Sequence, residues 1–185
     1  MKTRRFVGID IHKRHVVIAA VDKHQKVMLS PQKISNQQFN SWAIKHLKPS
    51  DKVAIEATTN SWTFHDQLEP LVKCVLVANS FKLKLITASS CKTDKHDAMV
   101  LAKLLAANLL PTVWVPPPQV RDLRNITQHR GQLIQKRTAA KNRLHGILHQ
   151  HNLLIPTGNP FLSSQEAWWQ NLTLSSVEKL PIKHY

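Results

Sequence analysis

Three short, β-branched segments follow one another at the start of the chain, at residues 5–11 (RFVGIDI), 15–21 (HVVIAAV) and 26–34. Only a few polar residues separate them, which is enough for a tight turn and too little for a helical crossover. Consecutive strands joined in this way pair antiparallel. The spacing therefore predicts a three-stranded meander as the first part of the fold.

The pattern then changes to an alternation of helices and strands. Apolar residues at helical spacing predict helices at 36–47, 61–71 and 95–110. Between them, residues 52–56 (KVAIE) and 73–78 (KCVLVA) are almost continuously apolar, which is typical of strands buried on both faces of a parallel sheet. A meander followed by this alternation predicts a mixed α/β sheet with flanking helices.

Three consecutive prolines at 116–118 mark the clearest boundary in the chain. We therefore expect a domain at residues 1–112, a proline-rich linker at 113–118, one long helix at 119–151, and a linker-like tail at 152–185.

The long helix concentrates positive charge. The whole chain has 26 Lys and Arg against 11 Asp and Glu, a net charge of +15, which favours a polyanionic partner such as nucleic acid. Between residues 119 and 151 seven basic residues face a single acid, Asp122, whereas a merely solvated helix face mixes both signs. The predicted nucleic-acid-binding residues are Arg121, Arg124, Arg130, Lys136, Arg137, Lys141 and Arg143.

Other features narrow the class of protein. The sequence contains no apolar run near the ~18 residues that a membrane-spanning helix needs. Its two cysteines, Cys74 and Cys91, are too few for a disulfide scaffold and fit a reducing compartment. We expect a cytoplasmic protein without a membrane partner.

Four acidic residues occupy positions where a carboxylate is unusual in such a basic chain. Asp10 lies inside the apolar segment FVGIDI, Glu56 ends VAIE, and Asp94 and Asp97 lie three residues apart at a helix start. A buried, unpaired carboxylate costs several kcal/mol, and a bound cation removes that cost. Each acid alone has an ordinary explanation as a helix cap or a surface charge. Together they predict an oxygen-rich pocket suited to Mg²⁺ or Mn²⁺.

The segments around these acids carry a family resemblance. GIDIHK (8–13), IEATTNSW (55–62) and KTDKHDAMVLA (92–102) resemble the three acidic motifs of the DEDD transposases of the insertion sequence 110 group, relatives of the Piv DNA invertase. The resemblance extends into the long basic helix. It implies a ribonuclease-H-like fold, similar to the Holliday-junction resolvase RuvC, followed by a coiled-coil-like helix.

The resemblance also implies a function. Asp10, Glu56, Asp94 and Asp97 would be the catalytic, Mg²⁺-binding residues of DNA transposition or site-specific recombination, directed in many members by a structured bridge RNA. The apolar stripe on the 119–151 helix would pack against a second copy, giving a homodimer or a higher homo-oligomer.

One part of the family pattern is missing. Family members continue into a domain with a serine nucleophile, whereas Ser163, Ser164, Ser175 and Ser176 of this chain lie in no such motif. We therefore name no nucleophile and expect an N-terminal part of a transposase.

Three other functions remain open. A non-catalytic RNA- or DNA-binding accessory protein and a Holliday-junction-type nuclease both fit the same fold. An actin-like sugar kinase or ATPase also begins with Gly-Ile-Asp, but it needs glycine-rich phosphate loops, and this chain has four scattered glycines.

Overall fold

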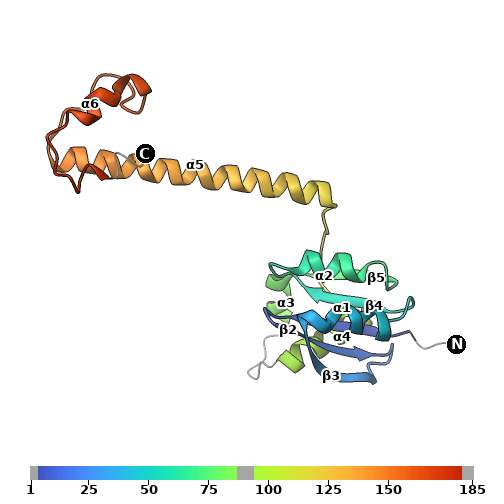
Figure 1. Ribbon diagram of the computed structural model, residues 1–185. Coiled ribbons are helices and arrows are strands. Elements are labelled where there is room, and N and C mark those ends of the chain that lie inside the picture. The colour runs from blue at the N-terminus through green and yellow to red at the C-terminus, as the bar shows by residue number, and fades with distance from the viewer. Residues whose placement is uncertain (1–3, 87–93, 181–185) are drawn as a thin grey trace. The chain divides into compact units, whose positions relative to one another are not determined.

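The computed structural model describes residues 4–86 and 94–180, except for the side chains of Asp94 and Lys95. The chain divides into two compact units, residues 1–115 and 116–185. Each is described by itself below (Figure 1).

The first unit is built on a six-stranded sheet with the order β3-β2-β1-β4-β5-β6. β1 runs antiparallel to β2 and parallel to β4; β2 pairs antiparallel with β3, β4 parallel with β5, and β5 antiparallel with β6. The predicted meander and the predicted mixed sheet are both confirmed. The strands are β1 (Phe6–Ile11), β2 (His15–Val21), β3 (Val27–Ser35), β4 (Lys52–Glu56), β5 (Cys74–Ala78) and β6 (Thr112–Val113).

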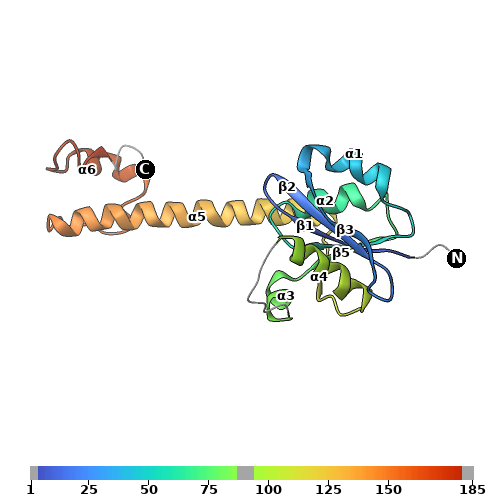
Figure 2. The same ribbon diagram turned by 90° about the horizontal axis from the view of Figure 1, so that it is seen from below.

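One face of the sheet carries the larger core. The helices α1 (Asn36–His46) and α2 (Ser61–Leu68) cover it, and Phe39 and Phe64 meet edge to face with ring centroids 5.0 Å apart. Beneath them lie the alternate residues of the strands, such as Ile9 of β1 and Ile55 of β4. The apolar residues buried on this face stabilise the domain. Figure 2 shows α1 and α2 on this side of the sheet.

The helices α3 (Ser80–Ile86) and α4 (Asp94–Ala106) cover the opposite face. Its strand residues are smaller, including Gly8, Ala54 and Ala78, so α4 packs close to the sheet. A Cβ atom on Gly8 would lie 2.6 Å from the backbone nitrogen of Ala102 and would also collide with the Ala98 carbonyl. Glycine is required at this position because α4 occupies the space of a side chain.

Two helices are shorter than the sequence predicts. α2 ends at Leu68 rather than 71. α4 ends at Ala106 rather than 110, because Asn108 adopts a left-handed backbone conformation with φ of 57°. The Leu109 amide then donates to the Leu104 carbonyl at 2.9 Å, which closes the last turn. The chain that follows forms β6, a strand that sequence patterning missed.

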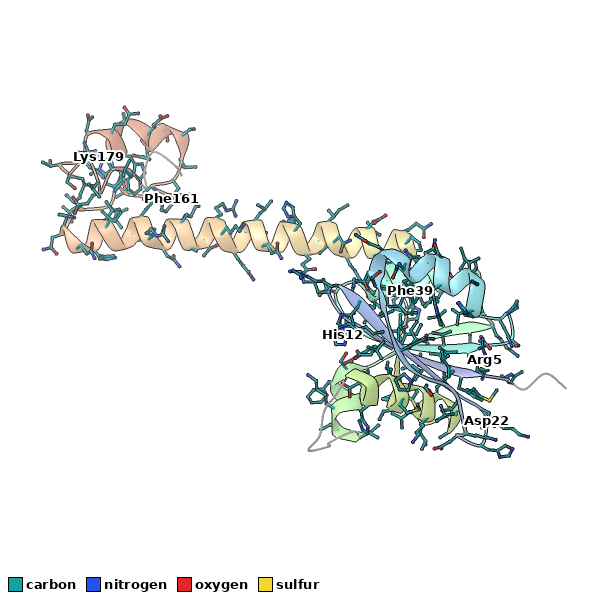
Figure 3. The ribbon with its side chains drawn as sticks, turned by 60° about the horizontal axis from the view of Figure 1, so that its bottom comes forward. Arg5, His12, Asp22, Phe39, Phe161 and Lys179 are labelled. Atoms are coloured by element: carbon teal, nitrogen blue, oxygen red, sulfur yellow. The ribbon has the colours of Figure 1, made fainter. Side chains whose placement is uncertain are left out.

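Asp51 corrects another expectation from the sequence, which favours a surface position for an aspartate in a turn. The side chain is fully buried. Its carboxylate accepts hydrogen bonds from Arg5 at 2.5 and 3.1 Å and from the Lys48 amide at 2.9 Å. Figure 3 labels Arg5 beside the start of the sheet. This buried ion pair joins the segments that lead into β1 and β4.

The second unit consists of a long helix and a short returning segment. α5 (Pro118–Gln150) begins one residue before the predicted helix, with proline in its first turn, where a missing amide hydrogen costs nothing. After it, a 3₁₀ turn (Ser163–Gln165) leads into α6 (Glu166–Gln170), a helix that the sequence analysis did not identify.

The segment after α5 is more ordered than a linker. Trp169 and Leu172 are buried against Leu144 and Leu148 of α5. The Trp169 indole donates to the Pro160 carbonyl at 2.7 Å, and Phe161, labelled in Figure 3, stacks on the same indole. The described residues after α5 therefore form a small core with the end of the helix. No helix in the described ranges has the length and hydropathy required to cross a lipid bilayer.

Candidate metal centre and basic helix

Asp10 and Glu56 lie at the carboxyl ends of two adjacent parallel strands. The register pairs Ile9 of β1 with Ile55 of β4, and one further residue brings Asp10 opposite Glu56. Side chains alternate along a strand, so both acids project from the face that bears Gly8 and Ala54, the face covered by α4. Asp10 is buried and Glu56 is half-buried.

α4 brings a third acid to the same place. Asp97 precedes Ala98, which is fully buried against Val17 and Ala19 of β2. Val17 is the β-ladder partner of Asp10, so this end of α4 lies over the end of β1. The close approach permitted by Gly8 therefore positions Asp97 near Asp10.

The electrostatics of Asp10 reflect this crowding. Burial raises the pKa of the Asp10 carboxyl above its ordinary value of 3.8, and the nearby carboxylates of Asp97 and Glu56 raise it further. His12 acts in the opposite direction and lowers the pKa, through its charge and a hydrogen bond. The balance still disfavours the ionised form of Asp10.

His12 is the polar partner of Asp10. Its Nε2 lies 2.9 Å from Asp10 Oδ2, and its ring stacks on His15 with centroids 4.6 Å apart. Asn36 donates to the carbonyls of His12 and Lys13 at 3.1 Å, which fixes the turn between β1 and β2. Figure 3 labels His12.

The donor set fits a divalent cation. Asp10, Glu56 and Asp97 supply only carboxylate oxygens, the ligands that Mg²⁺ prefers. Their mutual repulsion and the burial of Asp10 would both be relieved by a bound positive charge.

The fourth predicted ligand is only partly placed. Asp94 is the first residue of α4, one turn before Asp97, but its side chain lies outside the described part of the structure. His96, between the two acids, is exposed on a different side of α4 from Ala98.

The predicted basic residues all lie on α5. Arg124, Arg130, Lys136, Arg137 and Arg143 are exposed. The other two are half-buried: Arg121 donates to the Pro116 carbonyl at 2.7 Å, and the Lys141 ammonium lies 4.7 Å from the centre of the Phe161 ring.

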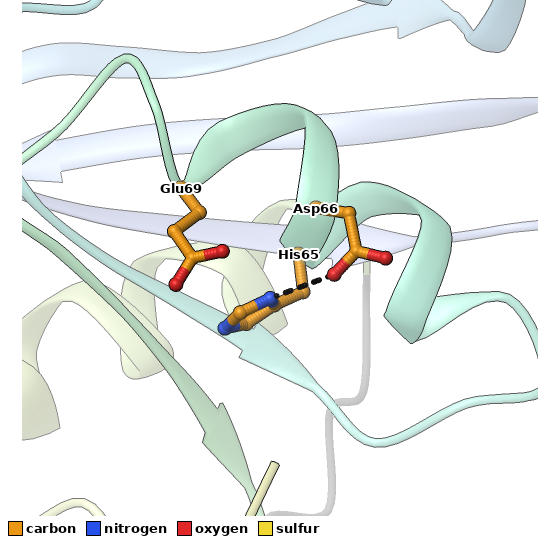
Figure 4. A group of neighbouring side chains, drawn as sticks. All are labelled: His65, Asp66 and Glu69. Atoms are coloured by element: carbon orange, nitrogen blue, oxygen red, sulfur yellow. Dashed lines mark hydrogen bonds and ion pairs between the residues drawn. The ribbon is translucent and has the colours of Figure 1, made fainter. Parts of the chain in front are cut away.

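A second group of ligand-type side chains was missed. His65 and Asp66 of α2 and Glu69, which directly follows the helix, lie together, with their ligand atoms within 4.8 Å of one another and His65 Nδ1 3.2 Å from Asp66 Oδ1 (Figure 4). The signal was the helical spacing of His65 and Glu69. Exposed acids of this kind are common without a metal, and we assign them no function.

A sheet with an antiparallel meander, parallel strands beyond it, and carboxylates at the ends of β1 and β4 defines a ribonuclease-H-like α/β domain. A sequence profile of the DEDD transposases of the insertion sequence 110 group, described as "Transposase", matches residues 7–153. The chain belongs to this family.

Two curated proteins show the same relationship. The "Transposase for insertion sequence element IS1533" of Leptospira borgpetersenii is 27% identical over 179 residues, covering 93% of this chain and 51% of that protein. The "Putative transposase y4qE" of Sinorhizobium fredii is 24% identical over 98 residues, covering 53% of this chain and 25% of that protein. The chain spans about half the length, or less, of these relatives.

Proposed function

We propose that this chain provides the metal-binding and nucleic-acid-binding part of a cytoplasmic transposase that moves DNA. The observation that carries the proposal is the crowding of Asp97 and Glu56 around the buried Asp10; in the described part of the chain, no arginine or lysine is among the groups that shift its pKa. A structural carboxylate would have such a partner, as Asp51 has in Arg5.

In this proposal Asp10, Glu56, Asp94 and Asp97 hold Mg²⁺ or Mn²⁺. A divalent ion held there would polarise a scissile phosphate as a Lewis acid and would stabilise the charge of the leaving oxygen. The chain contributes orientation: β1 and β4 fix two of the carboxylates, and His12 holds one oxygen of Asp10 through a 2.9 Å hydrogen bond.

The exposed basic residues of α5 are proposed to bind phosphates of DNA and of a structured guide RNA. Arg124, Arg130 and Arg143 are exposed and spread along the helix, so they can follow a nucleic-acid backbone. Nothing on α5 resembles a base-reading motif, so recognition by shape and backbone fits best, as for structured RNA.

α5 is also proposed to form the dimer contact. Its carboxyl-terminal apolar residues, Leu144 and Leu148, are covered by Trp169 and Leu172. Nearer its start, Leu123, Ile126 and Leu133 are each more than half exposed. A second copy of α5 would bury this uncovered part of the stripe.

The test is Mg²⁺ titration by calorimetry, comparing the unmodified chain with Asp10→Asn and Asp97→Asn. Both substitutions should abolish Mg²⁺ binding because each removes one ligand charge from the same site. RNA affinity, measured by fluorescence anisotropy, should stay nearly unchanged because α5 is intact.

Asp22→Asn is the matched control. Asp22 accepts hydrogen bonds from the His24 and Lys26 amides in the β2–β3 turn, and its replacement should leave Mg²⁺ binding as it is. Equal loss of Mg²⁺ and RNA binding in Asp10→Asn would contradict the division of roles. An unmodified chain that binds RNA but no Mg²⁺ would favour the accessory binding protein.

A further inference from the structure

α3 exposes an unusual amount of apolar surface for a helix at the edge of a domain. Only Leu83 faces the core, where it packs with Ala78, Leu101 and other residues beneath α4. Phe81 is 73% exposed and Leu85 is 70% exposed. Large apolar side chains gathered on one exposed face usually mark a binding surface.

The exposed face of α3 has a defined arrangement. At about 100° per residue, Phe81 and Leu85 lie together on the side opposite Leu83. Lys82 and Lys84 flank this apolar pair, one on each side. Neither lysine forms an ion pair within the described residues, and no acid occurs in α3. We call Phe81, Lys82, Lys84 and Leu85 the α3 platform.

The helix that carries the α3 platform begins beside the carboxylate site. Glu56 is paired in register with Ala78, and α3 begins two residues later. The Ser80 hydroxyl donates to the Ala57 carbonyl at 2.8 Å, and the Ala57 amide donates to the Ala78 carbonyl at 3.0 Å, so the start of α3 is joined to the residue after Glu56. Leu83 packs with Ala54 and Ala78 on the sheet face that bears Asp10 and Glu56. Figure 2 shows α3 and α4 on this side of the sheet.

We infer that the α3 platform holds an unpaired DNA strand beside the carboxylate site, with a base stacked on Phe81 and flanking phosphates on Lys82 and Lys84. An exposed aromatic ring between lysines is the arrangement with which proteins bind single strands without reading sequence. The lysines on both sides of the apolar pair complement the phosphates that flank a stacked base. This inference rests on the proposed function, because that function makes DNA the substrate at this edge of the sheet.

The experiment measures binding of the whole chain to a single-stranded DNA oligonucleotide that contains 2-aminopurine, in buffer with EDTA. Phe81→Ala should weaken binding roughly tenfold, within the range of one base–aromatic stack, and should reduce the quenching of 2-aminopurine. Phe81→Trp should restore both. The double variant Lys82→Gln/Lys84→Gln should lower the slope of log affinity against log salt by about 1.4, or ~0.7 for each lost phosphate contact.

Two matched controls separate the α3 platform from general surface effects. Ile44 is 62% exposed on α1, over the opposite face of the sheet, so Ile44→Ala removes similar exposed apolar surface elsewhere. Lys23→Gln/Lys26→Gln removes two exposed lysines at the β2–β3 turn. Both controls should leave quenching and affinity unchanged.

Several outcomes would overturn the inference. If Phe81→Ala and Ile44→Ala bound the DNA oligonucleotide with equal affinity, no base would stack on Phe81. A Phe81 effect found only with an RNA oligonucleotide would assign the face to RNA, and a changed oligomeric state with unchanged DNA affinity would assign it to protein. These assays exclude metal, so they separate the two proposals. If DNA binding depends on Phe81 but the chain fails to bind Mg²⁺, the α3 platform is retained and the metal centre is rejected. If the chain binds Mg²⁺ but DNA binding does not depend on Phe81, only the α3 platform is rejected.

Discussion

Two buried aspartates lie at opposite ends of the β1–β4 strand pair, and their surroundings differ in kind. Asp51, just before β4, accepts two hydrogen bonds from Arg5 and one from the Lys48 amide. Asp10, near the end of β1, has His12 as its hydrogen-bonding partner and the acids Asp97 and Glu56 nearby.

The difference separates a structural carboxylate from one arranged for binding. Burial of a charge is tolerated when an opposite charge and hydrogen bonds replace water, as they do at Asp51. At Asp10 the neighbouring acids add repulsion to the cost of burial. Such an arrangement fits the proposed function, in which a divalent cation would complete the site and offset this cost.

The largest expected effect on stability follows from removing the Asp51 carboxylate. Asp51→Ala leaves the Arg5 guanidinium without its carboxylate, and we expect the free energy of unfolding to fall by about 3 kcal/mol. Urea denaturation measures this. Asp22→Asn, in an exposed turn, should cost less than about 1 kcal/mol. A loss no larger than that of the control would show that the Arg5 pair contributes little to stability.

The sequence could not have identified Asp51 as buried from its local surroundings. Its partner lies 46 positions earlier in the chain, and a turn aspartate between serine and lysine is usually solvated. The clue lay in topology: Arg5 and Asp51 each precede a buried strand, and parallel neighbours begin at the same edge of a sheet. Strands and helices were predictable because hydrophobic periodicity is local.

The candidate metal centre stays a prediction, but the unusual positions of two of its acids could be recognised from the sequence, because the signal is local. Asp10 and Glu56 interrupt apolar strands, and such interruptions are visible without knowing any contact. The depth of the site was not predictable, because it depends on the close packing of α4 at Gly8. The return of Trp169 onto α5 was missed since one short amphipathic turn carries too little periodicity.

Gly8→Ala tests whether the close packing of α4 on the sheet creates the crowded carboxylate site at Asp10. The new methyl group would meet backbone atoms of Ala98 and Ala102, so α4 must shift, at a cost of about 2–3 kcal/mol. Mg²⁺ binding, measured by calorimetry on the folded variant, should weaken because Asp97 moves with α4. Gly131→Ala in α5 is the matched control.

A methyl group on Gly131 would meet no atom within 4 Å, so alanine there should stabilise the helix by about 0.5–1 kcal/mol. Unchanged Mg²⁺ affinity in folded Gly8→Ala would show that the carboxylates do not depend on the position of α4.

Asp10→Asn should change stability in the opposite direction from Asp51→Ala. Without metal, the substitution removes a buried charge and its repulsion with Asp97, so the free energy of unfolding should rise by about 1 kcal/mol, as for a typical stabilising substitution. Thermal unfolding in EDTA measures this. Added Mg²⁺ should then stabilise the unmodified chain and leave the variant unaffected. If Asp10→Asn instead lowered the free energy of unfolding in EDTA, Asp10 would be a structural acid like Asp51.

The smallest effect concerns a third carboxylate, which has partners without burial. The Glu178 side chain is 35% exposed, and hydrogen bonds from the Ser175 hydroxyl and amide and from His151 lower its pKa from 4.5 to about 2. Because the folded pKa is depressed, this contribution is present above pH 4.5 and is lost as the pH falls toward 2. In Ser175→Ala the pKa of Glu178 should rise toward 4.5 but stay below it, since the amide and His151 remain; NMR titration measures it.

Solvent screens the Glu178 carboxylate, so the free energy of unfolding of Ser175→Ala near pH ~7 should hardly change. A large loss there would mean that satisfied partners matter even without burial, and that the contrast between Asp51 and Asp10 reflects their partners alone.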